Sequence, residues 1–82
     1  MDNKEVLEVI KTIIENVLGM TNLVIADETT ANDVDGWNSL TNMQIISELE
    51  KHFDIKFKLR EIIKTKNVGD LCSIINKKLE SK

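Results

Sequence analysis

Apolar residues recur at steps of three and four along most of the chain, which is the spacing that places them on one face of an α-helix. The first such pattern follows Asp2 and Glu5, a pair typical of a helix start, and stops at Gly19, a residue type that ends helices. Its apolar positions are Val6, Ile10, Ile13, Ile14 and Val17. The pattern predicts a long amphipathic helix between Asp2 and Gly19.

Residues 20–38 lack a sustained helical period and predict a long loop, with Leu23, Val24 and Ile25 attaching it to the core. A loop of this length in a small domain is usually functional or disordered. The helical period resumes over residues 39–53 and predicts a second long helix. Its expected apolar face consists of Leu40, Met43, Ile46, Leu49 and Phe53.

Residues 54–58 alternate polar and apolar positions, but with no second strand to pair with we interpret them as a connection with Ile55 and Phe57 turned inward. A short helix is expected around residues 59–63, and Asn67 is placed to cap a final helix. The apolar face of that helix is Val68, Leu71, Cys72, Ile75 and Leu79. The prediction is therefore an all-α four-helix bundle forming one domain over residues 1–82.

Composition agrees with a helical fold and restricts the environment. Proline is absent and aromatic residues make up only 4% of the chain. Cys72 is the single cysteine, so no internal disulfide forms, and its place on an apolar face predicts a small core residue. No basic and apolar leader begins the chain, and no apolar run approaches the length of a bilayer. We expect a cytoplasmic protein without a membrane partner.

Charge is divided along the chain more strongly than the net charge of −3 indicates. Residues 27–54 contain seven acidic side chains and one basic side chain, whereas residues 55–82 contain eight basic and three acidic side chains. An acidic middle segment attracts basic protein surfaces and repels nucleic acid phosphates. The charge pattern therefore excludes a nucleic acid partner at the acidic end.

The segment Gly36-Trp37-Asn38-Ser39-Leu40 stands where the long loop meets the second predicted helix. A serine hydroxyl at a helix start is exposed, and unpaired backbone N–H groups beside it favour an anionic substituent. The acidic loop, this motif and the apolar pattern after it closely resemble the acyl carrier protein family over nearly the whole chain. The resemblance implies the acyl-carrier type of bundle, with three longer helices, a short third helix and a long loop between the first and second.

By this resemblance, Ser39 is the residue esterified with 4′-phosphopantetheine, whose thiol holds an acyl group as a thioester. The chain is then a discrete carrier and not an enzyme, and it delivers acyl intermediates in fatty-acid, polyketide or related biosynthesis. The implied partners are a phosphopantetheinyl transferase and the ligase or synthase enzymes that load the acyl group. We expect the carrier to be a monomer.

One residue departs from the family pattern, because Asn38 stands where the family usually has Asp. The amide oxygen of Asn still caps a helix as a carboxylate does, but the negative charge is lost. In the family that charge helps to engage the transferase.

The resemblance also implies the residues that surround the attachment site. Acids in the loop and on the second helix receive Arg and Lys from partner enzymes in the family, and here they are Asp33, Asp35, Glu48 and Glu50. Apolar cargo enters a cavity between the second and third helices. The residues here that correspond to its lining are Met43, Ile46, Leu59 and Ile62.

Other interpretations of these residues remain open. An aminoacyl or peptidyl carrier that works with an adenylating enzyme fits the same motif, and so does an unmodified helical interaction module, which Asn38 favours. Trp37 either anchors the loop against the bundle or contacts a partner. No metal site is expected, because a calcium loop beginning at Ala31 lacks acidic residues at its first and twelfth positions. His52 lies too far along the second helix to serve Ser39 as a base.

Overall fold

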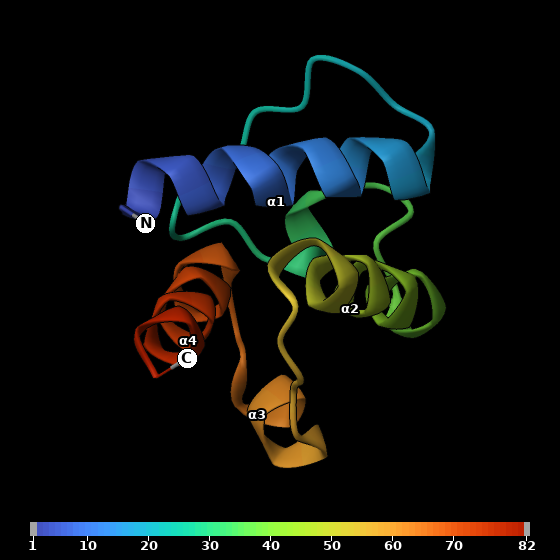
Figure 1. Ribbon diagram of the computed structural model, residues 1–82. Helices are drawn as coiled ribbons and strands as arrows, with labels where there is room; N and C mark the ends of the chain where they lie inside the picture. Colours follow the sequence, from blue (N-terminus) through green and yellow to red (C-terminus); the bar gives the residue numbers. More distant parts are fainter. Residues whose placement is uncertain (1, 82) are drawn as a thin grey trace.

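The computed structural model describes residues 2–81 and arranges them in three tiers (Figure 1). Helix α1 (Asn3–Leu18) forms the first tier, and α2 (Ser39–Phe53) and α4 (Val68–Glu80) lie beneath it in the second. The short helix α3 (Leu59–Lys64) lies on the far side from α1. The long loop contains one 3₁₀ turn, η1 (Ala31–Asp33). No strand occurs in the described range, and the predicted all-α architecture is confirmed.

The helix ends follow the residues that predicted them. Asp2 caps α1 by accepting a hydrogen bond from the Glu5 N–H at 2.9 Å. Gly19 ends α1 at a φ of 67°, a left-handed conformation that glycine adopts without strain. Asn67 caps α4 by accepting from the Asp70 N–H at 2.8 Å. Local capping chemistry therefore sets the boundaries of these helices.

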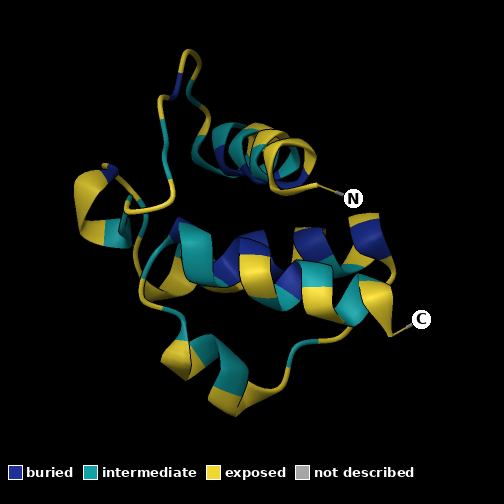
Figure 2. Cartoon of the chain, turned by 90° about the vertical axis from the view of Figure 1, so that its left-hand side faces the viewer, coloured by how far each residue is buried: buried dark blue, intermediate teal, exposed yellow. Residues whose placement is uncertain are grey.

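The core lies where α1 faces α2 and α4, and Figure 2 shows buried residues concentrated along these helices. The predicted faces of α1 and α4 supply much of it, and the connection 54–58 adds Ile55, with Phe57 packed against the core as predicted. Cys72 is 1% exposed, and burial together with the nearby Asp27 charge raises the pKa of its thiol to about 11. The thiol therefore stays protonated at neutral pH and acts as a small core group.

Two parts of the predicted core are wrong. On α2, the buried side chains are Ile45, Ile46, Leu49 and Phe53, whereas Leu40 and Met43 are exposed. Leu40 precedes Leu49 by nine residues, which places the two roughly on opposite sides of a helix that turns by about 100° per residue. In the long loop, Leu23 is buried as predicted but Val24 is 90% exposed.

Hydrogen bonds made by the backbone of the long loop attach it to α1 and to α4. The Leu23 N–H donates to the Glu15 carboxylate on α1 at 2.9 Å. At the start of α4, the Val68 N–H donates to the Thr29 carbonyl at 2.8 Å and the Gly69 N–H donates to the Asp27 carbonyl at 2.7 Å. These bonds fix the path of the chain on its way to α2.

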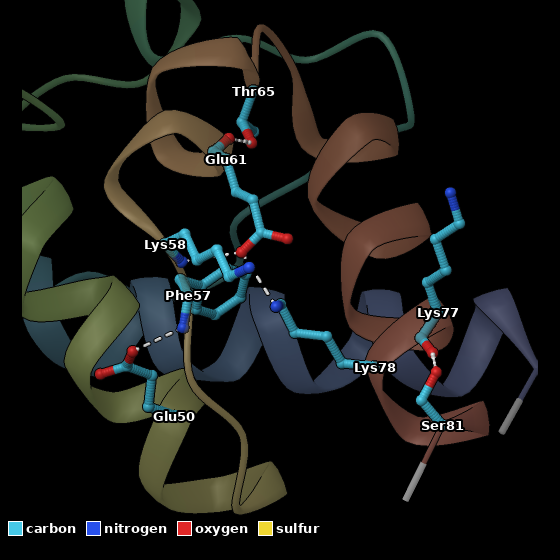
Figure 3. A network of polar contacts seen from close by, with 8 residues as sticks. All are labelled: Glu50, Phe57, Lys58, Glu61, Thr65, Lys77, Lys78 and Ser81. Atoms are coloured by element: carbon cyan, nitrogen blue, oxygen red, sulfur yellow. Dashed lines mark hydrogen bonds and ion pairs between the residues drawn. The ribbon is translucent and has the colours of Figure 1, made fainter.

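Helix α3 contains no fully buried residue, and polar contacts hold it together with the packing of Ile62 against the core (Figure 3). The Glu50 carboxylate accepts from the Phe57 N–H at 2.8 Å, just before α3 begins. The Glu61 carboxylate accepts from the Lys58 N–H at 2.7 Å and pairs with Lys78 of α4 at 2.9 Å. The Lys78 ammonium also lies 5.8 Å from the centre of the Phe57 ring. Polar contacts therefore join α3 to both α2 and α4.

Candidate functional site

Ser39 is the first residue of α2 and is exposed. Within residues 2–81, its hydroxyl has no hydrogen-bond partner. The hydroxyl stands at the N-terminal end of a helix of 15 residues, where the macrodipole favours negative charge. It is therefore accessible to an incoming enzyme and lies in a field that favours a phosphodiester.

Asn38 caps α2 and changes one expectation about this site. Its side-chain oxygen accepts from the N–H groups of both Leu40 and Thr41, each at 3.0 Å, and its carbonyl accepts from the Asn42 N–H at 2.8 Å. The expectation of unpaired N–H groups beside Ser39 is thus wrong for Leu40 and Thr41, while the Asn42 N–H makes the first ordinary bond of the helix. An anion on Ser39 is favoured by the aligned peptide dipoles and not by these N–H groups.

Thr41 completes the helix start, and the sequence analysis did not identify it. Its hydroxyl accepts from the Asn38 N–H at 2.8 Å and lies 2.7 Å from the Gly36 carbonyl, to which it donates. A cap at Asn38 followed three residues later by a side chain that bonds back to it is the capping-box arrangement. The sequence does contain a signal for this role, because Thr41 follows the cap residue Asn38 by three positions.

The turn before Ser39 is held by Gly36 and Trp37. Gly36 has a φ of 88°, which side-chain-bearing residues rarely adopt. Trp37 is partly buried against the core, and its indole N–H donates to the Asn42 side-chain oxygen at 2.9 Å. This placement favours the interpretation of Trp37 as an anchor for the loop.

A cavity of about 120 Å³ lies between the loop, α2, α3 and the start of α4. Trp37 and Asn42 line it near Ser39, and Lys66 lines it from the connection after α3. Of the four predicted pocket residues, Ile46 and Ile62 contribute to the lining. Met43 and Leu59 are instead 51% and 69% exposed and are not part of this cavity. The structure therefore brings two of the four together.

The four predicted docking acids do not form one patch. Asp33 and Asp35 are exposed in the loop before Ser39, although the Asp33 carboxylate accepts from the Thr30 N–H at 2.9 Å. Glu48 pairs with Lys51 at 3.4 Å and lines the groove between α1 and α2.

Glu50 is the least available of the four. Its carboxylate is engaged with the Phe57 N–H inside the chain and is partly buried. The loop acids are therefore the best placed of the set to meet a partner at Ser39.

Across residues 2–81, no group of three or more His, Cys, Asp or Glu residues is placed to hold a metal ion. His52 is exposed at the far end of α2, with its ring edge-on to Phe53 at 4.8 Å between centroids. No helix in that range is both long and apolar enough to cross a bilayer.

Comparison with known proteins identifies the same motif and fold. The family model for a phosphopantetheine attachment site matches residues 8–75. The acyl carrier protein of Streptococcus pyogenes serotype M3 is 38% identical over 73 residues, covering 89% of this chain and 95% of the relative. The acyl carrier protein of Thermotoga maritima is 30% identical over 76 residues, covering 93% and 94%.

A solved structure agrees with these sequence relatives. The solution NMR structure of the holo acyl carrier protein from Geobacter metallireducens superposes with a TM-score of 0.85 at 44% sequence identity, covering 92% of this chain and 86% of that one. An exposed, unpartnered serine hydroxyl at a helix start fits covalent attachment of the phosphopantetheine for which the family model is named. This chain thus belongs to the acyl carrier protein family, whose members hold acyl groups on 4′-phosphopantetheine.

Proposed function

We propose that this chain carries acyl groups on a 4′-phosphopantetheine attached to Ser39 and delivers them to biosynthetic enzymes. The observation that carries the proposal is the Ser39 hydroxyl, which is exposed and unpartnered at the first position of α2 within a Gly-Trp-Asn-Ser-Leu motif. When attached, the prosthetic group supplies a thiol that holds the acyl group as a thioester.

The neighbouring residues hold the attachment point in place. Asn38 and Thr41 fix where α2 begins, so the backbone that carries Ser39 is held in place. Gly36 and Trp37 fix the turn that leads into the helix. The dipole of α2 then stabilises the phosphodiester charge by roughly 0.3–1 kcal/mol.

A rigid base under a flexible arm is suited to transfer between enzymes. A tethered acyl group reaches a high effective concentration at the active site of a docked partner. We propose a phosphopantetheinyl transferase and acyl-loading ligases or synthases as these partners, and we propose that the chain itself catalyses no step. A cytoplasmic location remains a prediction from the sequence.

The cavity beside Ile46 and Ile62 is suited to an apolar cargo. At about 120 Å³ it holds a short acyl segment, and a longer chain requires α3 to move outward. No residue of α3 is fully buried, and Ile62 is its side chain packed against the core, so that movement gives up the contacts of one partly buried side chain. Helix α3 is therefore the wall that adapts to cargo length.

Loading of the holo protein tests this function. We expect an acyl ligase with ATP and a fatty acid to add one acyl group to the holo form, and hydroxylamine to cleave the thioester and release that group as a hydroxamic acid. The apo form and Ser39→Ala should remain unloaded. If adenylating enzymes load amino acids onto the holo form while every acyl ligase fails, the protein is an aminoacyl carrier and this proposal is wrong.

A further inference from the structure

The segment around α3 is the most basic stretch of the chain. Residues 56–66 contain five basic side chains and one acidic side chain, Glu61. Each of the five basic residues is exposed. Because Glu61 is paired with Lys78 and only 28% of its side chain is exposed, it offsets little of the positive charge seen from outside. This segment therefore presents positive charge in a chain whose net charge is negative.

Exposed apolar side chains accompany these charges. Leu59 and Ile63 are 69% and 73% exposed. They are four residues apart on α3 and therefore share one face of the helix. Ile62, between them in the sequence, instead lines the cavity toward α2. We call the exposed face formed by Leu59 and Ile63 with Lys58, Arg60, Lys64 and Lys66 the cationic α3 surface.

This surface lies beside the end of the molecule that carries Ser39. Lys66, which follows α3, lines the same cavity as Trp37 and Asn42, two residues that flank the start of α2. At one edge of this surface, the Asp70 carboxylate accepts from the Lys66 N–H at 3.0 Å. Asp54 lines a groove together with Lys56 and Lys64. Through Lys66, the cationic α3 surface thus borders the cavity that Trp37 and Asn42 line beside Ser39.

We propose that the cationic α3 surface docks a protein partner through an acidic patch with an apolar centre. The proposal rests on the proposed function, because the arm on Ser39 must enter the active site of that partner. The positive charges of Arg60 and Lys64 require an acidic patch on the partner. The exposed side chains of Leu59 and Ile63 require an apolar centre within that patch. Such a partner carries basic groups for Asp33 and Asp35 and acidic groups for α3.

The alternative occupant of this surface is an anionic bilayer, and the neighbouring charges disfavour it. Basic groups beside apolar side chains do attract anionic lipid headgroups. However, the exposed Asp33 and Asp35 at the same end would be repelled by that lipid surface. Two apolar side chains on a helix of six residues also offer little area for insertion. A protein surface can present both signs of charge, whereas an anionic bilayer cannot.

An NMR titration of the full-length apo protein tests the proposal. The probes are a short helical peptide with Glu on one face and Leu on the other, its Gln and Lys counterparts, and phosphatidylglycerol vesicles. We expect the Glu peptide to shift amide signals selectively over residues 58–66, with an affinity that falls as salt is added. Arg60→Glu and Lys64→Glu should each weaken this binding about threefold or more.

Lys4→Glu is the matched control, because it changes an exposed lysine on α1 by the same charge and should leave binding unchanged. Equal binding of the Gln peptide, or no shift over residues 58–66, would overturn the proposal. Tighter binding of the vesicles than of the Glu peptide would assign the surface to a bilayer instead. The titration needs no prosthetic group, so Ser39→Ala should bind equally, and a failure of the proposed function would leave this result unaffected.

Discussion

Asn38 connects the loop to α2 through hydrogen bonds of both its side chain and its backbone. Its side-chain oxygen accepts from two N–H groups of the first helical turn, and its N–H donates to Thr41. It stands where the family usually has Asp, so this chain keeps the cap and lacks the charge. Capping and partner recognition are therefore separable at this position.

Substitution of Asn38 should reveal the two roles. Asn38→Ala removes the cap and should lower the free energy of unfolding by about 1 kcal/mol. Asn38→Asp keeps the acceptor and should match or exceed the wild-type stability, because its charge meets the helix dipole. Urea denaturation measures both. An Asp variant as unstable as the Ala variant would contradict this account of the cap.

The same pair of variants addresses transferase recognition. Asn38→Asp should speed modification by a transferase specialised for fatty-acid carriers, and the gain should shrink as salt is added. Equal rates at low salt would show that the transferase recognises the shape of this residue and not its charge.

Among the elements, α3 depends most on polar contacts. The Lys58 N–H and then the Lys78 ammonium lower the pKa of the Glu61 carboxyl below the ordinary 4.5. Because the folded-state pKa is depressed, this stabilisation is complete above about pH 4.5 and is lost as the pH falls through the lower folded value. Acidification should therefore loosen α3 before the core.

Lys78→Gln separates the two contributions to Glu61. In an NMR titration of the Glu61 carboxyl, the variant should move the midpoint upward toward 4.5, yet leave it below that value because the Lys58 N–H still donates. Hydrogen exchange of the α3 amides should also become faster. Lys77→Gln is the control, since Lys77 is exposed and not paired with Glu61. An unchanged midpoint in Lys78→Gln would show that the ion pair does not form in solution.

At the scale of the whole molecule, the start of α4 positions the long loop that leads to Ser39. A Cβ added at Gly69 would lie 3.0 Å from the Asp27 carbonyl oxygen and 3.1 Å from the Asp27 Cβ. Gly69 also donates its N–H to that carbonyl at 2.7 Å. The close approach of two backbones therefore requires glycine here.

Gly69→Ala tests this contact against helix propensity. Alanine is favoured in a helix by about 1 kcal/mol, but displacement of the loop should outweigh that gain and lower the free energy of unfolding by about 1–2 kcal/mol. Ser73→Ala, on an exposed position of the same helix, should change stability little. If thermal denaturation shows Gly69→Ala to be more stable than wild type, the loop does not pack against α4 as described.

The division of charge along the chain should govern encounter with partners. Reversing Asp35 to Lys should slow modification by the transferase more than reversing Lys77 to Glu, because Asp35 precedes Ser39 and Lys77 lies on α4. Rim charges act mainly on association, so the change should appear in the second-order rate constant and in its salt dependence. A larger effect of the Lys77 reversal would place the docking surface at the other end of the molecule.

The sequence predicted what local patterns determine. Helical spacing and capping residues located α1, α2 and α4, and the motif identified the loop-to-helix junction. It failed on α2, because each step of three residues moves the side chain by about 60° around the helix, so Leu40 and Met43 leave the buried face. It could not foresee that Glu50 would bond to the Phe57 N–H, since that contact depends on how the connection folds back.

The most direct test of the central claim is the intact mass of the protein after incubation with coenzyme A, magnesium and a broad-specificity phosphopantetheinyl transferase. The account predicts one phosphopantetheinyl adduct on wild type and on Ser47→Ala, an exposed serine of the same helix, and none on Ser39→Ala. No adduct on wild type would make the chain an unmodified helical module. An unchanged adduct on Ser39→Ala would place the prosthetic group elsewhere and contradict the site described here.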